Sequence, residues 1–72
     1  MVRINVNCFK LSGLRIRLGM SVKELAEEAG VTRQAIYALE SGMMRPNPAT
    51  AKKIVEALSI GFDDIFSLVE GD

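Results

Sequence analysis

Two short helical segments with a very short connection constrain this chain more than any other feature. Residues 22–29 and 33–41 carry apolar side chains at helical spacing, and only Gly30, Val31 and Thr32 separate them. A connection this short does not let two helices pack antiparallel, but it fits a wide crossing angle. Gly30 suits the turn because glycine adopts a positive φ at little cost.

Small and apolar residues at matching positions strengthen this interpretation. Ala26 stands where the helices would cross most closely, and a larger side chain would hold them apart. Val31 would fill the angle between them. Three further residues would anchor both helices to a core: Leu25, Ile36 and Leu39. An ordinary helical hairpin is the alternative, but the complete set favours a helix-turn-helix unit over residues 22–41.

Polar capping residues predict where the helices begin. Four such residues each precede a segment with helical apolar spacing: Asn7, Ser21, Thr32 and Asn47. Ser21 and Glu24 form a capping-box pattern, and Pro48 suits the first turn of a fourth helix. A fifth helix is expected at about residues 62–67, where Asp63 and Asp64 would favour its positive N-terminal end.

Residues 2–6 alternate between apolar and polar side chains, which predicts a short strand. A single strand needs a partner, and the apolar tail around Phe66, Leu68 and Val69 is the only other candidate. We therefore expect the two terminal segments to pair as a β-ribbon, within one subunit or across a dimer. The expected fold class is all-α, with five helices and this ribbon in one domain, residues 1–72.

Composition excludes several other sources of stability and function. The 72 residues include one cysteine, Cys8, and no histidine, so no internal disulfide and no usual zinc site is expected. Cys8 is interpreted as a small hydrophobe at the junction of strand and helix, with a redox sensor as the alternative. No apolar run approaches the about 20 residues that span a bilayer. We expect a cytoplasmic protein with no metal, cofactor or membrane partner.

The charges are unevenly distributed although the net charge is zero. Residues 1–53 contain nine Lys or Arg and four Asp or Glu, a net charge of +5, and residues 54–72 carry a net charge of −5. A neutral total can therefore include one basic face that meets phosphate. Ordinary solvated surface charge is the alternative.

Residues 9–66 resemble the Cro/CI-type (Xre) helix-turn-helix family without a gap. The segments that carry the resemblance are Leu14-Arg15, Leu18 to Ser21, Glu24 to Ala26, Gly30 to Ile36, Leu39 to Gly42, Arg45 to Pro48 and Phe62 to Phe66. The resemblance implies a five-helix, lambda-repressor-like DNA-binding domain whose third helix, residues 33–41, reads the major groove. It also implies an ion pair between Arg15 and Glu40, with a phosphate contact as the alternative role for Arg15.

Three positions depart from the family pattern. Val22 replaces the usual glutamine at the start of the second helix, so that only its backbone N–H can serve there. Ser59 replaces the glycine after the fourth helix, which should strain or loosen that end. Gly61 is a weak N-cap for the fifth helix.

The exposed side of the third helix supplies the expected DNA contacts. Four residues are predicted to meet bases: Arg33, Gln34, Tyr37 and Ala38. Arg33 can pair with guanine and Gln34 with adenine, while Tyr37 has a phosphate contact as its alternative. Seven residues are predicted to meet phosphates, the last two less firmly: Ser21, Lys23, Thr32, Ser41, Arg45, Arg17 and Lys10.

One recognition helix reads few bases, so a homodimer on two half-sites of a double-stranded operator is expected. The tail offers an apolar dimer surface, from which some residues must close the core: Phe62, Ile65, Phe66 and Leu68, with Ile60 and Val69 beside them. We interpret the chain as a transcriptional repressor and not an enzyme, with no small-molecule ligand at this length. The alternative is a protein-binding adaptor or antitoxin on the same fold.

Overall fold

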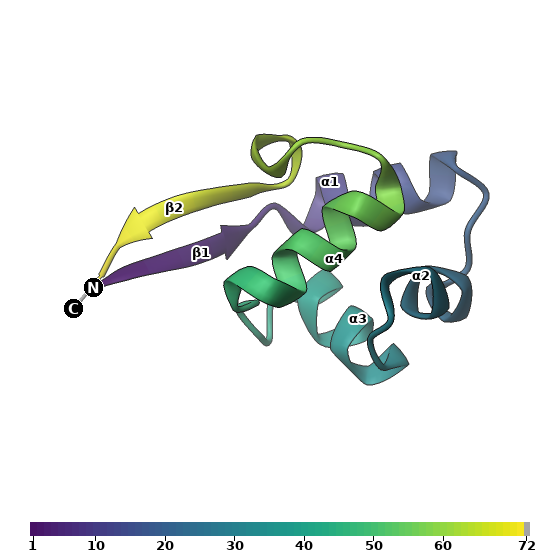
Figure 1. The fold of residues 1–72 in the computed structure, drawn as a ribbon, viewed down its shortest axis with the longest axis horizontal. Helices are drawn as coiled ribbons and strands as arrows, with labels where there is room; N and C mark the ends of the chain where they lie inside the picture. The colour runs from purple at the N-terminus through teal and green to yellow at the C-terminus, as the bar shows by residue number, and fades with distance from the viewer. Residues whose placement is uncertain (72) are drawn as a thin grey trace.

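A computed structural model describes residues 1–71 (Figure 1). The elements follow in the order β1 (Val2–Val6), α1 (Cys8–Arg17), α2 (Val22–Ala29), α3 (Arg33–Glu40), α4 (Pro48–Leu58), the 3₁₀ turn η1 (Phe62–Asp64) and β2 (Phe66–Glu70). The helices gather at one end of the molecule, and the two strands project from them as a ribbon that carries the N-terminus at its tip.

The helices begin at the capping residues that the sequence predicted. Asn7 Oδ1 accepts from the backbone N–H of Lys10 at 3.1 Å, and Thr32 Oγ1 accepts from that of Ala35 at 3.1 Å. At α2 the Ser21 hydroxyl accepts from the Glu24 N–H at 3.0 Å, while the Glu24 carboxylate accepts from the Ser21 N–H at 2.9 Å. These bonds satisfy N–H groups that have no partner inside a helix.

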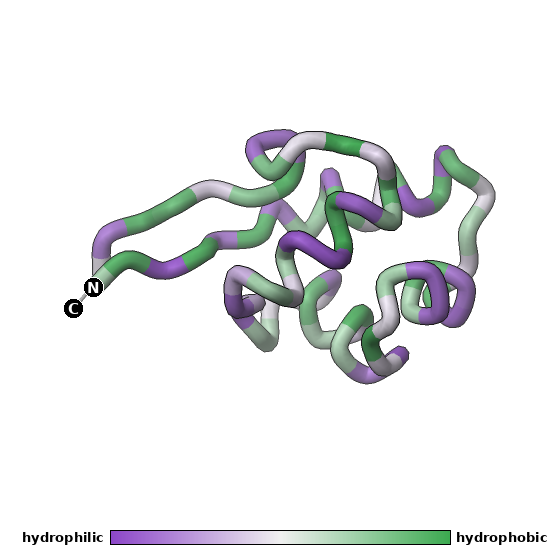
Figure 2. Tube along the Cα trace, in the orientation of Figure 1, coloured by the Kyte–Doolittle hydropathy of each residue, from purple (hydrophilic) through white to green (hydrophobic). Residues whose placement is uncertain are grey.

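One apolar core lies between the helices and under the base of the ribbon. Its most completely buried side chains come from every helix and from the segment before β2: Leu11, Leu25, Ile36, Leu39, Ile54 and Ile65. Figure 2 shows how hydrophobic and hydrophilic positions alternate along each element. Because each helix buries only one face, the opposite faces of α2 and α3 stay available for solvent or a partner.

The predicted fifth helix is wrong. The helical turn stops after η1, Ile65 leaves the helical region at φ −132°, and Phe66 to Glu70 form a strand. The structure therefore contains four α-helices and a two-stranded sheet among residues 1–71, and it is not all-α. Gly61 provides no side-chain cap for a longer helix, and pairing with β1 satisfies the backbone groups of β2.

The predicted ribbon is present, and its strands pair within one chain. β1 and β2 run antiparallel, with Val6 opposite Phe66, Ile4 opposite Leu68 and Val2 opposite Glu70. Ile4 and Phe66 are buried at the base of the ribbon, whereas Leu68 is 64% exposed. At the tip, the Gly71 N–H donates to the Met1 carbonyl at 2.7 Å.

The end of α4 contains the strained residue that the sequence predicted. Ser59 has φ +56°, the only positive φ of a non-glycine residue among residues 1–71. Residues other than glycine rarely adopt this left-handed conformation, because Cβ crowds the backbone.

Among residues 1–71, no helix is long and apolar enough to cross a membrane.

Candidate nucleic-acid interface

The turn between α2 and α3 has the geometry that its sequence predicted. Gly30 ends α2 in the left-handed conformation at φ +71°, and the Val31 N–H donates to the Ala26 carbonyl at 3.0 Å. Ala26 is 2% exposed, so that its methyl group lies inside the angle between the helices. Thr32 then returns to an extended conformation and starts α3. The two helices therefore meet at a compact turn that is closed by backbone hydrogen bonds from Gly30 and Val31.

The two faces of α3 have different roles. Ile36 and Leu39 are completely buried and hold the helix against the core. Arg33, Gln34 and Tyr37 are exposed on the opposite face. Ala38, which was also predicted to contact bases, is half-buried, so that only part of its methyl group is accessible. Three of the four predicted base-contact residues thus lie fully on the outer face of α3.

Arg15 and Glu40 fasten the end of α3 to α1. Arg15 Nε lies 2.7 Å from Glu40 Oε2, and Arg15 Nη2 donates to Glu40 Oε1 at 3.1 Å. Arg15 Nη1 donates to the Met20 carbonyl at 2.8 Å, and the Ser12 hydroxyl donates to Glu40 Oε1 at 2.7 Å. Because these bonds occupy the Arg15 guanidinium, its alternative role as a phosphate contact does not fit the structure.

The same network determines the charge state of both partners. Burial raises the pKa of Glu40, but hydrogen bonds from Arg15 and Ser12 lower it by more, so that this pKa lies below its ordinary value of 4.5. The hydrogen bond to Glu40 raises the pKa of Arg15. Both side chains are therefore charged at neutral pH, and their interaction is available to position α3.

Polar groups gather where α2 and α3 begin. The oxygens of Ser21 and Thr32 accept backbone N–H groups, which leaves each hydroxyl proton free to be donated to a ligand. Lys23 is exposed in the first turn of α2. At the other end of α3, the Ser41 hydroxyl donates to the Ala38 carbonyl at 3.2 Å and would have to turn away to donate elsewhere.

Two predicted phosphate contacts do not lie on this side of the molecule. Arg17 and Lys10 line a shallow groove on α1 together with Ile60 and Asp64. Arg17 is two residues from Arg15, which corresponds to a rotation of about 200° around the helix. Since Arg15 faces α3, Arg17 faces away from α3, and its phosphate contact stays a prediction.

Two residues predicted for a dimer interface lie in the core of the single chain. Ile65 is 1% exposed and Phe66 3% exposed, because the start of β2 covers the helices. The Phe66 ring packs against that of Phe62 at a centroid distance of 5.3 Å. These two residues are therefore unavailable to a partner, and their predicted interface role is wrong. Leu68 stays exposed and Phe62 half-buried.

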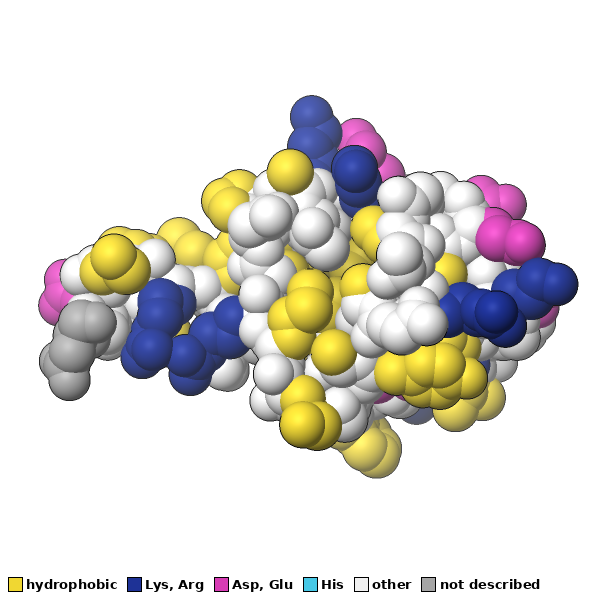
Figure 3. Space-filling model, turned by 90° about the horizontal axis from the view of Figure 1, so that it is seen from below, with side chains coloured by type: hydrophobic (Ala, Val, Ile, Leu, Met, Phe, Trp, Pro, Cys, Tyr) yellow, Lys and Arg dark blue, Asp and Glu magenta, His cyan; other side chains and the backbone are white. Residues whose placement is uncertain are grey.

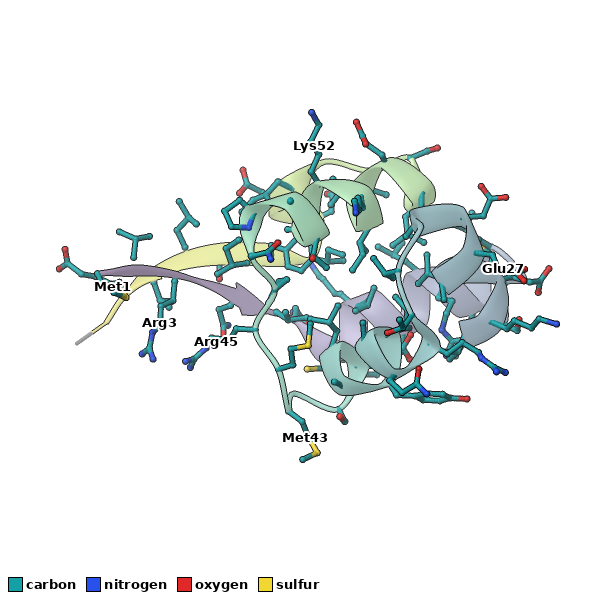
Figure 4. All side chains as sticks on the ribbon, turned by 60° about the horizontal axis from the view of Figure 1, so that its bottom comes forward. Met1, Arg3, Glu27, Met43, Arg45 and Lys52 are labelled. Atoms are coloured by element: carbon teal, nitrogen blue, oxygen red, sulfur yellow. The ribbon has the colours of Figure 1, made fainter. Side chains whose placement is uncertain are left out.

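Lys and Arg side chains occur on the side of the molecule that α3 faces. Figure 3 shows one group beside the ribbon and a second near α2, while Asp and Glu side chains lie mostly at the margins of this view. Arg45, in the loop after α3, extends toward this side (Figure 4). Arg3 on β1 extends the same way, although no pattern in the sequence predicts a DNA contact there.

A tight turn between two short helices, with a polar outer face on the second, defines the helix-turn-helix class of DNA-binding transcriptional regulators. The chain belongs to the family described as Helix-turn-helix (HTH_3), whose model matches residues 11–65. The resemblance to Cro/CI-type (Xre) regulators is thereby confirmed.

Similar proteins carry the same description. The chain is 43% identical over 61 residues to YgzD, an uncharacterized HTH-type transcriptional regulator of Bacillus subtilis, and the match covers 85% of this chain and 92% of that protein. It is 47% identical over 57 residues to an HTH-type transcriptional regulator of Methanothermobacter thermautotrophicus, covering 78% of this chain and 83% of the other. These relatives are named as regulators and not as enzymes.

Solved structures share the fold. The restriction-modification controller protein C.AhdI of Aeromonas hydrophila superposes with a TM-score of 0.76 at 26% identity, covering 79% of this chain and 86% of the controller. An HTH_3 family transcriptional regulator of Vibrio cholerae gives 0.75 at 29% identity, covering 81% of this chain but only 33% of that longer one.

Proposed function

We propose that this chain is a repressor that binds a specific double-stranded DNA operator as a homodimer, with α3 in the major groove. The observation that supports this most is the division of α3 into two faces. Arg33, Gln34 and Tyr37 are exposed, while Ile36 and Leu39 are buried behind them. Helix-turn-helix proteins direct the N-terminal residues of the recognition helix at base edges, and Arg33 and Gln34 occupy those positions.

The side chains on α3 have the chemistry for base recognition. Arg33 is suited to a bidentate pair with guanine O6 and N7, and Gln34 to one with adenine N6 and N7. The accessible part of the Ala38 methyl suits a thymine methyl group. Tyr37, which is 60% exposed, can pack along the groove or donate to a phosphate. These contacts supply the sequence preference of the proposed complex.

Phosphate contacts would hold the protein in register around α3. The Ser21 and Thr32 hydroxyls and the free N–H groups at the starts of α2 and α3 are suited to one side of the groove. Lys23 adds a cation there, and Arg45 adds one beyond the C-terminal end of α3. Ser41 would join them once its hydroxyl turns from Ala38.

Dimerisation is proposed through the apolar face of the ribbon. Val2 is 61% exposed and Leu68 is 64% exposed, and Phe62, which precedes Leu68 by six residues, is half-buried. Val2 lies two positions before the buried Ile4 in β1, and Leu68 is paired with Ile4 across the ribbon. The three side chains therefore lie on the same face. A second copy that covers this face would remove apolar surface from water and bring two recognition helices into one assembly.

Selection of bound duplexes from a random DNA pool tests the proposal. The expected result is an enriched site with two symmetric halves whose centres lie about one helical turn apart. Retention on heparin that falls steeply with salt would accompany it, since each phosphate contact displaces counterions. If no sequence is enriched and retention is weak and insensitive to salt, the DNA proposal fails, and the protein-binding adaptor or antitoxin alternative is favoured.

A further inference from the structure

The ribbon carries an arginine on the side that faces away from its apolar contacts. In a strand, successive side chains point to opposite faces, so that Arg3 and Asn5 share one face of β1 while Ile4 lies on the other. Asn5 lines an open groove together with Gly42, Met43, Met44 and Arg45 of the loop after α3. The base of β1 therefore lies beside this loop, with Val6 also lining the groove, and Figure 4 shows Arg3 on the same side of the molecule as Arg45.

Arg3 and Arg45 extend to the same side of the molecule. Figure 4 shows both guanidinium groups on the side from which Met43 also projects, and Figure 3 shows Lys and Arg atoms gathered in this region. Both residues are exposed, and the only ion pair between residues 1 and 71 is that of Arg15 with Glu40. The ribbon thus prolongs the basic side of the molecule beyond the C-terminal end of α3.

The Arg3 side chain lies across the end of the ribbon, beside Gly71. A Cβ atom added to Gly71 would lie 2.6 Å from both Arg3 Nε and Arg3 Nη2, which is closer than real Cβ atoms approach. The absence of a side chain at Gly71 therefore leaves the space that the guanidinium occupies. The hydrogen bonds between Met1 and Gly71 hold this part of the strand pair in place.

We infer that the ribbon is a second DNA contact, in which Arg3 donates to the sugar-phosphate backbone next to the phosphates bound by Arg45. This inference rests on the proposed binding of α3 in the major groove. β1 extends about 10 Å from Val6 to Arg3 at roughly 3.3 Å per residue. Val6 lines a groove with the loop after α3, and the major groove is about 12 Å wide, so Arg3, at this distance beyond Val6, is assigned to the flanking backbone and not to the base edges.

This assignment is compatible with the proposed dimer, because the two use opposite faces of the ribbon. One face carries Val2, Ile4 and Leu68, with Glu70 at its end, and the other carries Arg3 and Asn5, paired with Val69 and Ser67. A guanidinium that binds phosphate contributes affinity and position but no sequence preference. Arg3 therefore acts as a positioning residue that lengthens the contact with DNA.

Salt titration of DNA binding tests the inference. Binding to a duplex of mixed sequence is measured for the parent, for Arg3→Gln and for Lys52→Gln over a series of salt concentrations. The duplex is about 24 base pairs long, which is slightly more than two turns of DNA. Lys52 is the matched control, because it is exposed on α4 and points away from Arg3 in Figure 4. Each phosphate contact contributes about 0.9 to the slope of log K against log salt, so Arg3→Gln should reduce this slope by about 0.9 for each bound subunit, or about 1.8 for the proposed dimer, with Lys52→Gln like the parent.

A second variant keeps the charge and moves the group. Gly71→Ala shifts the Arg3 guanidinium at little cost, because this group is the far end of a flexible side chain, so binding should weaken by less than in Arg3→Gln. A thermal melt of each variant checks the fold. Unchanged slopes for Arg3→Gln, or an equal loss for Lys52→Gln, would overturn the ribbon contact while the parent still binds. A parent that binds no duplex at low salt would instead overturn the proposed function itself.

Discussion

Arg15 Nε lies 2.7 Å from Glu40 Oε2, across the contact between α1 and the last turn of α3. The relative exposures of the two side chains are 14% and 13%, so water screens the pair only in part. The carboxylate also accepts from Ser12, and the guanidinium also donates to the Met20 carbonyl. This pair therefore determines the orientation of the recognition helix more than it adds to net stability.

Replacing Glu40 with glutamine should destabilise the protein by about 2 kcal/mol. This lies between the loss of up to about 1 kcal/mol for an exposed ion pair and the loss of about 3–5 kcal/mol when one partner of a buried pair is removed. The neutral amide leaves the Arg15 charge without its anionic partner. Chemical denaturation at pH 7 measures the change. Glu27→Gln, on the exposed side of α2, is the control and should stay within about 0.5 kcal/mol of the parent.

The same pair makes stability depend on acid. The pKa of Glu40 is lower in the folded chain than its ordinary value of 4.5, so the folded state binds this proton less readily than the unfolded state. Its contribution is complete above pH 4.5 and is lost as the pH falls through the folded pKa. Glu40→Gln should therefore lose less stability than the parent between pH 5 and pH 2. Parallel curves for the two proteins would contradict this assignment.

Ser59→Gly should stabilise the protein by about 1 kcal/mol, because glycine adopts the positive φ at the end of α4 without crowding. Gly30→Ala is the reverse experiment. No atom outside the neighbouring residues lies within 4 Å of a Cβ placed at Gly30. Gly30→Ala should therefore destabilise the protein by about 1 kcal/mol through the backbone conformation alone. Thermal unfolding of both variants checks the two signs, and a Ser59→Gly variant that melts below the parent would refute the strain.

Gln34→Ala should remove the preference for one base pair in each half-site and leave the fold intact. Its side chain is exposed and makes no hydrogen bond among residues 1–71, whereas a bidentate contact to adenine discriminates by about 1–3 kcal/mol. Binding to the selected site and to the site with that pair changed is compared by fluorescence anisotropy. Equal discrimination by variant and parent would remove Gln34 from base recognition.

Leu68→Lys should shift the proposed dimer toward monomer, because it places a charge in the centre of the exposed apolar face of the ribbon. Ser67→Lys is the matched control, since it adds the same charge one residue earlier on the opposite face. Analytical ultracentrifugation over a concentration series measures both. Dimerisation that survives Leu68→Lys, or that Ser67→Lys weakens equally, would locate the interface elsewhere.

The local parts of the fold were predictable from the sequence, and the errors came from long-range packing. Asn7, Ser21, Thr32 and Asn47 cap helices through bonds to residues three positions ahead, which the sequence order alone indicates. The start of the tail has helical signals at Asp63 and Asp64, but pairing with a strand more than 60 residues earlier decides its structure.

In the candidate site, too, the features that depend on local sequence could be predicted and those that depend on long-range packing could not. The outer face of α3 could be predicted, because the helical period separates Arg33 and Gln34 from Ile36 and Leu39. The apolar residues of the tail look equivalent in sequence, and only the contact of β2 with the helices buries Ile65 and exposes Leu68. Arg3 could not be predicted in this way, because its position on the same side as Arg45 depends on where the ribbon leaves the helices.

The pairing of β1 with β2 has a consequence for synthesis on the ribosome. The helices depend on contacts between neighbouring parts of the chain and can assemble while translation continues, but β1 has no partner until residues 66–70 have emerged. Until then the Ile4 side chain and the backbone of β1 remain open to water and to other strands. The nascent protein therefore completes the ribbon, and with it the face that carries Arg3, only when almost all of these 72 residues have been made.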